Sequence, residues 1–139
     1  MNNISPDFEI ELKVRDYELD LQGIVNNSVY QNYLEHARHE FLLSQNIDFA
    51  ALHAEGIDLI VSRVEIDYKA SLKSQDNFVV KLAMRKEGNV RIVFYQWIER
   101  LPDHKCMIEA KITGVCLKNG RPARPEITGM KIVDELTSS

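Results

Sequence analysis

The chain has 139 residues, of which 45% are hydrophobic, and this is the material of one domain with a single core, expected over residues 1–139. The formal net charge is −4 and the basic residues are scattered, which argues against a nucleic-acid partner, since that needs a concentrated basic face. No signal peptide, basic presequence or long apolar run is evident, so we expect a cytoplasmic protein with no membrane partner.

The sequence opens with a short strand, a polar loop and then a helix. Apolar and charged residues alternate over Phe8–Val14, whereas residues 16–27 lose this periodicity and contain one glycine. Asn27 or Ser28 can cap a helix that begins there. This helix is predicted from an apolar stripe at helical spacing, which must be buried. The stripe consists of Tyr30, Tyr33, Leu34, Ala37 and Phe41.

After a second short helical segment around Asp48–Ala54, which ends at Gly56, the apolar residues recur with the period of strands. Four long strand-like segments follow, and Gly88 and Asn89 suit a tight turn between the second and the third. The first segment alternates as in a sheet with one buried face. The residues expected to face inward are Val64, Ile66 and Tyr68 in the first segment, Phe78, Val80, Leu82 and Met84 in the second, and Cys106, Ile108, Ala110, Ile112, Gly114 and Cys116 in the fourth.

One strand, a helix and four strands joined by short connections predict an α+β fold, with an antiparallel five-stranded sheet curled around one long central helix and no parallel units. The third segment, Val90–Arg100, departs from simple alternation because both of its faces are apolar. The outer face, with Val93, Tyr95 and Trp97, suggests contact with another subunit. The alternative is coverage by the chain's own tail, residues 126–136, but this tail is short and only modestly apolar.

An isolated carboxylate, Asp20, lies in the polar loop before the long helix. The first amides of a helix lack internal acceptors, and they stabilise negative charge that develops in front of them. A carboxylate beside that helix end can attack a carbonyl, or activate water against it, while the free amides hold the oxyanion. The sequence therefore predicts acyl transfer to water.

Residues 15–42, RDYELDLQGIVNNSVYQNYLEHARHEFL, resemble the opening of hotdog-fold thioesterases of the 4-hydroxybenzoyl-CoA thioesterase type. Within that group the chain is most similar to the small acyl-acyl carrier protein thioesterases of plants. Residues 119–126, NGRPARPE, also resemble the family's C-terminal Gly-Arg-Pro ending. The residues that match the first motif are Asp20, Gly23, Val25, Tyr30, Glu35, Ala37 and Arg38.

The resemblance implies a hotdog fold that hydrolyses acyl-CoA or acyl-acyl carrier protein. It implies a homodimer joined edge to edge through its sheets, often paired again into a homotetramer, with each active site shared between two subunits. Asp20 would act as nucleophile or general base, and the backbone amide of Asn27 would hold the thioester oxygen. Larger plant relatives carry a histidine where this chain has Ile24, so Asp20 must work without an imidazole.

Several further residues are candidates for the site. The Asn26 side chain could orient Asp20 or the water, although an asparagine at a helix start more often serves as a cap. Glu35 could support the site across the dimer or simply pair along the helix. The residues expected to contact substrate are Gly23, Val25, Tyr30 and Ser62.

Other chemistries find less support in the residues. No Gly-x-Ser-x-Gly elbow, dinucleotide fingerprint or P-loop is present. His36 and His39 could in principle hold a metal, but they lie away from the apolar stripe, so we expect neither a metal nor a cofactor. Cys106 and Cys116 are interpreted as small core residues rather than nucleophiles.

Two further functions stay open on the same fold. An acyl-carrier dehydratase or hydratase would need a histidine base beside an acid, and none of the four histidines lies in the Asp20 loop. A non-catalytic acyl-CoA-binding or regulatory module would keep the groove but lack the acid, whereas Asp20 is present.

Overall fold

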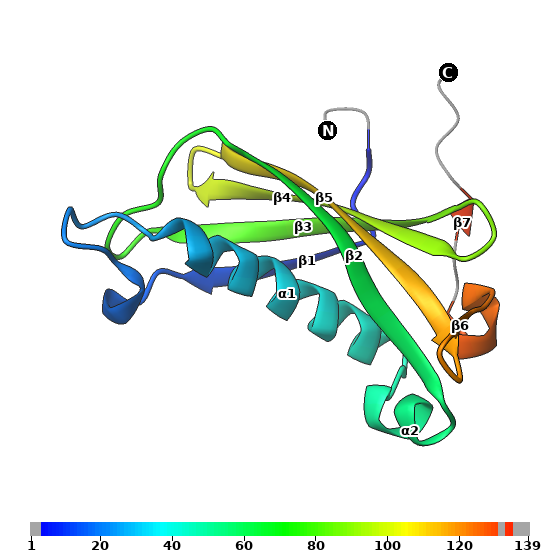
Figure 1. Ribbon diagram of the computed structural model, residues 1–139. Coiled ribbons are helices and arrows are strands. Elements are labelled where there is room, and N and C mark those ends of the chain that lie inside the picture. Colours follow the sequence, from blue (N-terminus) through cyan, green and yellow to red (C-terminus); the bar gives the residue numbers. More distant parts are fainter. Residues whose placement is uncertain (1–3, 131–132, 135–139) are drawn as a thin grey trace.

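The structure is a computed structural model that describes residues 4–130 and 133–134 (Figure 1). Its helices are α1 (Asn27–Ser44) and α2 (Phe49–Ala54), with 3-10 turns η1 (Asp16–Glu18) and η2 (Pro125–Thr128). Its main strands are β1 (Phe8–Lys13), β2 (Ile57–Tyr68), β3 (Asn77–Glu87), β4 (Arg91–Leu101) and β5 (Lys105–Lys118). Two short strands, β6 (Arg121–Pro122) and β7 (Val133–Asp134), extend the sheet.

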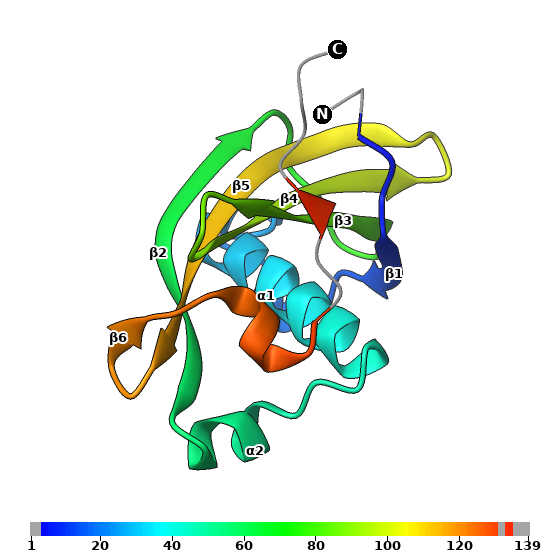
Figure 2. The same ribbon diagram turned by 90° about the vertical axis from the view of Figure 1, so that its right-hand side faces the viewer.

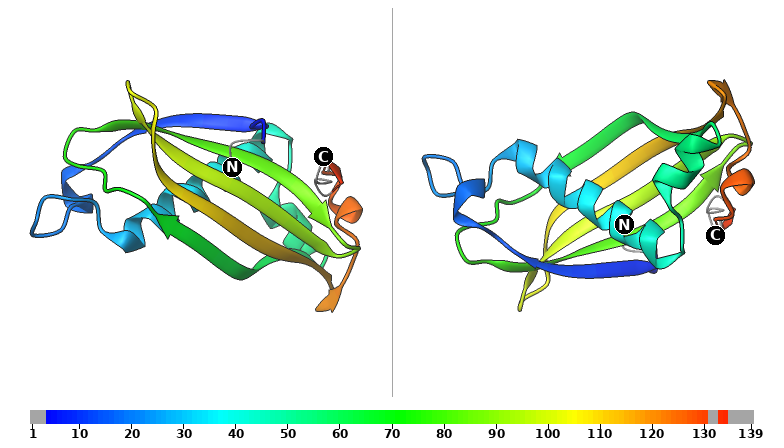
Figure 3. Two further views of the ribbon diagram at one scale, coloured as in Figure 1. Left: turned by 90° about the horizontal axis from the view of Figure 1, so that it is seen from above. Right: turned by 90° about the horizontal axis from the view of Figure 1, so that it is seen from below.

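The main strands form one antiparallel sheet in the order β1-β3-β4-β5-β2. The sheet curls around α1, which lies along its concave face (Figures 2 and 3). This confirms the predicted α+β architecture. Two details differ from it: the sheet has seven strands once β6 and β7 are included, and β7 pairs parallel with β3. No helix within the described residues is both long and apolar enough to cross a membrane.

The core lies between α1 and the concave face of the sheet. The predicted helical stripe is buried, together with the inward residues of β3. One inward position is polar: Gln96 on β4 is 0% exposed. Its amide nitrogen donates to the carbonyl of Leu34 at 2.9 Å, and its amide oxygen accepts from Arg38 at 2.9 Å. Gln96 therefore ties α1 to the sheet by hydrogen bonds as well as by packing.

Strand β2 does not have the single buried face that its alternation predicts. Val64 and Tyr68, expected to face inward, are each 43% exposed. The reason is its place in the sheet: β2 is an edge strand, paired only with β5, and a cavity separates Val61 and Val64 from α1. The exposed apolar residues of β2 are Ile60, Val61, Val64 and Tyr68.

The predicted facing of Cys106 is wrong. The register between β4 and β5 shifts after Ile98, which faces Ile108, so that Glu99 faces Cys106. This irregularity moves the Cys106 side chain to the outer face, because a one-residue slip reverses the side on which side chains lie. Cys116, which lies on the same side of the shift as Ile108, is buried as predicted, and both cysteines are free.

The outer face of β4 is already largely buried within this chain. Trp97 is 7% exposed and lines a depression together with Ile4 and Pro6 of the N-terminal segment. The described part of the C-terminal tail does not line this depression. Glu126 forms an ion pair with Lys86, and Met130 belongs to the hydrophobic core. The remaining tail positions of the prediction, 131–132 and 135–136, lie outside the described residues.

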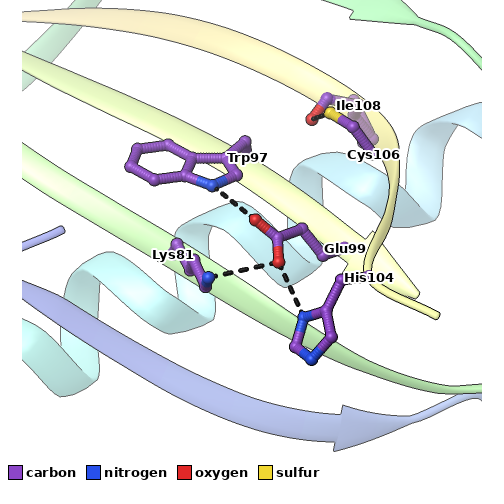
Figure 4. A network of polar contacts seen from close by, with 6 residues as sticks. All are labelled: Lys81, Trp97, Glu99, His104, Cys106 and Ile108. Atoms are coloured by element: carbon purple, nitrogen blue, oxygen red, sulfur yellow. Dashed lines mark hydrogen bonds and ion pairs between the residues drawn. The ribbon is translucent and has the colours of Figure 1, made fainter. Parts of the chain in front are cut away.

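Glu99 is the centre of a polar network on this outer face (Figure 4). Its carboxylate accepts hydrogen bonds from Trp97 Nε1 at 3.0 Å and His104 Nδ1 at 2.9 Å, and it lies 3.1 Å from Lys81 Nζ. Burial alone would raise the pKa of Glu99, but the donors from His104, Lys81 and Trp97 outweigh it and hold the pKa below its ordinary value. The folded protein therefore stabilises the ionised form of Glu99 relative to the unfolded chain.

This network predicts a pH-dependent contribution to stability. Because the pKa of Glu99 is lower in the folded protein than in the unfolded chain, its charge adds to the free energy of unfolding. This contribution is complete above the pKa of an unfolded glutamate, about 4.3, and is lost as the pH falls through the pKa of the folded state. We expect Glu99→Gln to lower the free energy of unfolding by roughly 1–3 kcal/mol at pH 7, and by much less at pH 3. Urea denaturation at both pH values measures this difference.

The matched control is Glu87→Gln, which removes a carboxylate from one long ion pair of 3.8 Å with Lys111 on the same sheet. We expect a smaller loss there, since Glu87 has one distant ion-pair partner within the described part of the chain and is screened by solvent. A loss for Glu99→Gln of the same size at pH 7 and pH 3 would contradict the assigned charge.

Candidate active site

Asp20 lies in a tight loop whose backbone fixes its carboxylate. The Asp20 amide donates to the carbonyl of Ile24 at 2.9 Å, and Leu19 and Val25 form an isolated β-bridge below it. Oxygen Oδ1 accepts from the amides of Gln22 at 2.8 Å and Ile24 at 3.3 Å. The side chain is exposed, and among the described residues Oδ2 accepts no hydrogen bond. One carboxylate oxygen is thus held by the loop, while the other faces solvent.

The loop is anchored by the segment that precedes β3. The amide of Val25 donates to the carbonyl of Leu72 at 2.9 Å, and the amide of Leu72 donates to the Tyr30 hydroxyl at 2.8 Å. Val25 and Tyr30 are both buried, and burial raises the pKa of Tyr30. These two residues were predicted to bind substrate. The structure places them in the core, where they hold the loop and the start of α1 together.

Helix α1 begins one residue earlier than its predicted cap implies. The cap is Asn26, whose side-chain oxygen accepts from the amide of Ser28 at 3.1 Å, instead of Asn27 or Ser28. Asn27 is the first helical residue, and its amide donates to no acceptor among the described residues. Of the two roles weighed for Asn26, the structure shows the cap. It leaves the Asn27 amide available to a ligand.

The other two predicted substrate residues lie at the surface. Gly23 is exposed in the Asp20 loop and has a φ of 78°, a left-handed conformation that favours glycine. Ser62 is exposed on β2, and its hydroxyl donates to the carbonyl of Thr113 at 3.2 Å. The structure therefore brings Asp20, Gly23 and the Asn27 amide into one loop and helix start, and leaves Ser62 on the edge strand.

A cavity of about 490 Å³ lies between α1 and the strands β2, β4 and β5. Its walls are mostly apolar on the sheet side and mostly polar along α1, and of the candidate site residues only Glu35 is in its lining. The apolar lining is Leu42, Phe49, Leu59, Val61, Val64, Phe94 and Ile112, and the polar lining is Gln31, Glu35, Arg38 and His39. The sequence held a signal for this wall, since Gln31 and Glu35 are four residues apart, and Arg38 and His39 follow Glu35 by three and four residues, which places all four on one side of the helix.

Arg38 is the most enclosed charge of this cavity. Its Nη1 donates to Gln96, and its guanidinium lies 6.0 Å from the centre of the Phe94 ring. Burial lowers the pKa of Arg38 from its ordinary value, and the negative charge of Glu35 opposes this. Because Arg is protonated at any physiological pH, the group is a fixed positive charge in a mostly apolar space.

A second cavity, of about 660 Å³, lies on the other side of α1, between that helix, β1 and η1. There the hydroxyl of Tyr33 donates to Glu18 at 2.7 Å, and burial together with this bond raises the pKa of Tyr33. His36 lines this second cavity whereas His39 lines the first, so the two histidines face different spaces. In residues 4–130 and 133–134, no group of His, Cys, Asp and Glu side chains is arranged to hold a metal.

Comparison with known proteins identifies the family. A family model described as the thioesterase-like superfamily matches residues 14–131. The chain is 47% identical over 117 residues to the chloroplastic acyl-acyl carrier protein thioesterase ATL2 of Arabidopsis thaliana. That match covers 84% of this chain and 62% of the relative, so the chain spans less than two thirds of the plant protein.

Solved structures agree on the fold. The probable thioesterase YbaW of Escherichia coli superposes with a TM-score of 0.74 at 29% identity, covering 85% of this chain and 90% of that one. The 1,4-dihydroxy-2-naphthoyl-CoA thioesterase Slr0204 of Synechocystis superposes with a TM-score of 0.79 at 20% identity, covering 85% and 88%. These likenesses confirm the predicted hotdog fold. The chain belongs to the thioesterase-like superfamily.

Proposed function

We propose that the protein is a thioester hydrolase that cleaves acyl-CoA or acyl-acyl carrier protein to the free acid and the thiol. The observation that carries this proposal is the pairing of an exposed carboxylate, Asp20, with a helix start whose Asn27 amide has no acceptor among the described residues. The relatives named as thioesterases support it.

The chemistry follows from these two groups. As a general base, Asp20 takes a proton from water, whose oxygen attacks the thioester carbonyl. As a nucleophile, its free oxygen attacks the carbonyl directly, and water then hydrolyses the resulting anhydride. In both cases the carbonyl oxygen becomes negative and accepts the hydrogen bond of the Asn27 amide. The thiolate then leaves and takes up a proton. This chain has Ile24 just before the Val-Asn-Asn triplet, so no imidazole takes part at that position.

In a single chain, Asp20 precedes the first turn of α1, whereas the 490 Å³ cavity, here called the α1–β2 cavity, extends along the helix from Gln31 to Leu42. From Asn27 to Arg38 the helix rises roughly 16 Å. Tyr68, at the end of β2, contacts the start of α1, since its ring lies 5.8 Å from that of Tyr30. Leu59, near the beginning of β2, lines the cavity. One strand thus connects the two halves of the proposed site.

We infer that a second copy brings these halves together. If β2 pairs antiparallel with β2 of a partner, the Tyr68 end of one strand meets the Leu59 end of the other. The catalytic loop of each copy then lies at the cavity of its partner. The free edge and exposed apolar residues of β2 support this homodimer, because an unpaired apolar edge strand invites pairing. Association of two dimers into a homotetramer extends the same proposal.

The hydrolase assignment predicts that Asp20→Asn lowers kcat/KM by about 100-fold to 10,000-fold, because the amide can neither accept the proton of water nor attack the carbonyl. Release of free thiol from a panel of acyl-CoA and acyl-carrier substrates measures this loss. Asp16→Asn is the matched control, since Asp16 is also an exposed carboxylate and lies only four residues away. Full activity in a folded Asp20→Asn protein would refute the role of Asp20, and substrate binding without turnover in the parent would favour a non-catalytic module.

The dimer predicts a different result for two exposed isoleucines. Ile60 on β2 is 49% exposed and Ile127 on η2 is 44% exposed. We expect Ile60→Lys to shift the protein to monomers at micromolar concentration, since it removes apolar area from the pairing edge and places a charge where the partner would exclude water. Ile127→Lys should keep the mass of the parent. Light scattering after size-exclusion chromatography measures the mass, and a monomeric parent or a dimeric Ile60→Lys variant would be the contrary outcome.

A further inference from the structure

We propose that Arg38 determines substrate specificity by binding an oxygen atom carried by the acyl group. The inference rests on the proposed hydrolase function and names its substrate class: acyl thioesters whose acyl part bears a hydroxyl, oxo or carboxylate oxygen away from the thioester bond. The α1–β2 cavity is the space in which this acyl part binds.

The orientation of Arg38 is fixed from behind. Gln96 is fully buried and uses both ends of its amide, the nitrogen for the Leu34 carbonyl and the oxygen for Arg38 Nη1. The ring of Phe94 lies beside the guanidinium. Arg38 cannot turn away from the cavity without leaving the amide oxygen of Gln96 unsatisfied in the core, which is costly. The arginine is therefore preorganised.

Arg38 has hydrogen-bond donors to spare. A guanidinium carries five N–H groups, and one bond, to Gln96, accounts for a single nitrogen. Among the described residues no carboxylate forms an ion pair with it. Glu35 lies one helical turn away, and its carboxylate is 3.9 Å from His39 instead. Arg38 also lines the cavity, so we expect its remaining donors to be within reach of a ligand bound there.

The rest of the sheet-side wall is apolar, with Phe94, Ile112 and Leu59 among its residues. An unsubstituted alkyl chain would fill this space by displacing water from the guanidinium, and it would return no hydrogen bond. A charged donor that loses water without a replacement is penalised heavily. An oxygen on the acyl group would replace that water, and a carboxylate could accept two bonds at once. The cavity therefore favours an oxygen-bearing chain over a plain one of equal length.

Arg38 could instead be only a tie between α1 and β4. The two roles differ in what a substitution changes. A tie affects the folded structure and lowers turnover of every substrate by a similar factor. A specificity residue changes the ratio between substrates, and it does so mainly through KM, since the contact lies away from the reacting atoms.

The test compares CoA thioesters of one chain length, such as octanoyl-CoA and its hydroxy, oxo and terminal carboxy derivatives. In the parent we expect kcat/KM for at least one oxygen-bearing substrate to exceed that for octanoyl-CoA by about tenfold or more. Arg38→Met should remove this preference, because it raises KM for the oxygen-bearing substrate more than KM for octanoyl-CoA. Arg38→Lys should restore part of it. Arg91→Met, an exposed arginine outside the cavity, is the matched control and should keep the parent ratio.

Several outcomes would overturn the inference. A parent that hydrolyses octanoyl-CoA as well as every derivative would do so, whether or not the Arg38 variants fold. An equal loss for all substrates in folded Arg38→Met would assign the residue to the structural tie. If the parent hydrolyses no thioester, the proposed function fails, and Kd values for the same panel, measured by calorimetry, still decide whether Arg38 selects the oxygen-bearing acyl group.

Discussion

Two hydrogen bonds to the backbone of Leu72 position the candidate catalytic loop. The carbonyl of Leu72 accepts from Val25, and its amide donates to the hydroxyl of Tyr30. One bond fixes the end of the Asp20 loop and the other fixes the first turn of α1. All the groups are buried, so neither bond can be exchanged for water without a penalty. The position of the Asp20 carboxylate relative to the Asn27 amide thus depends on Leu72, which belongs to a different segment of the chain.

Much of the fold could be predicted because its elements follow simple periods. The stripe of α1 and the inward residues of β3 are buried as their spacing requires, and both lie at the centre of the structure, where one face meets the core. The predictions failed where position in the sheet outweighs local pattern. Val64 and Tyr68 alternate like core residues, yet β2 is an edge strand. Cys106 lies beyond a register shift, which a strict period of two cannot anticipate.

The site divides in the same way. Asp20 and the start of α1 were predictable because a loop, a cap and a helix are local features of the chain. The roles of Val25 and Tyr30 depend on Leu72, which is more than 40 residues away in the sequence from each of them. Likewise, Arg38 and Gln96 are far apart in the sequence, and they form a hydrogen bond only because the sheet packs against α1. Contacts of this range depend on topology, and a single sequence gives little access to them.

The exposed edge of β2 has a thermodynamic consequence. If a second copy covers Ile60 and its neighbours, part of the apolar burial that stabilises this fold comes from association and not from the chain itself. The midpoint of thermal unfolding would then rise with the amount of protein in solution, by mass action. Dilution would weaken both the scaffold and its chemistry, so that the abundance of the protein itself would regulate it.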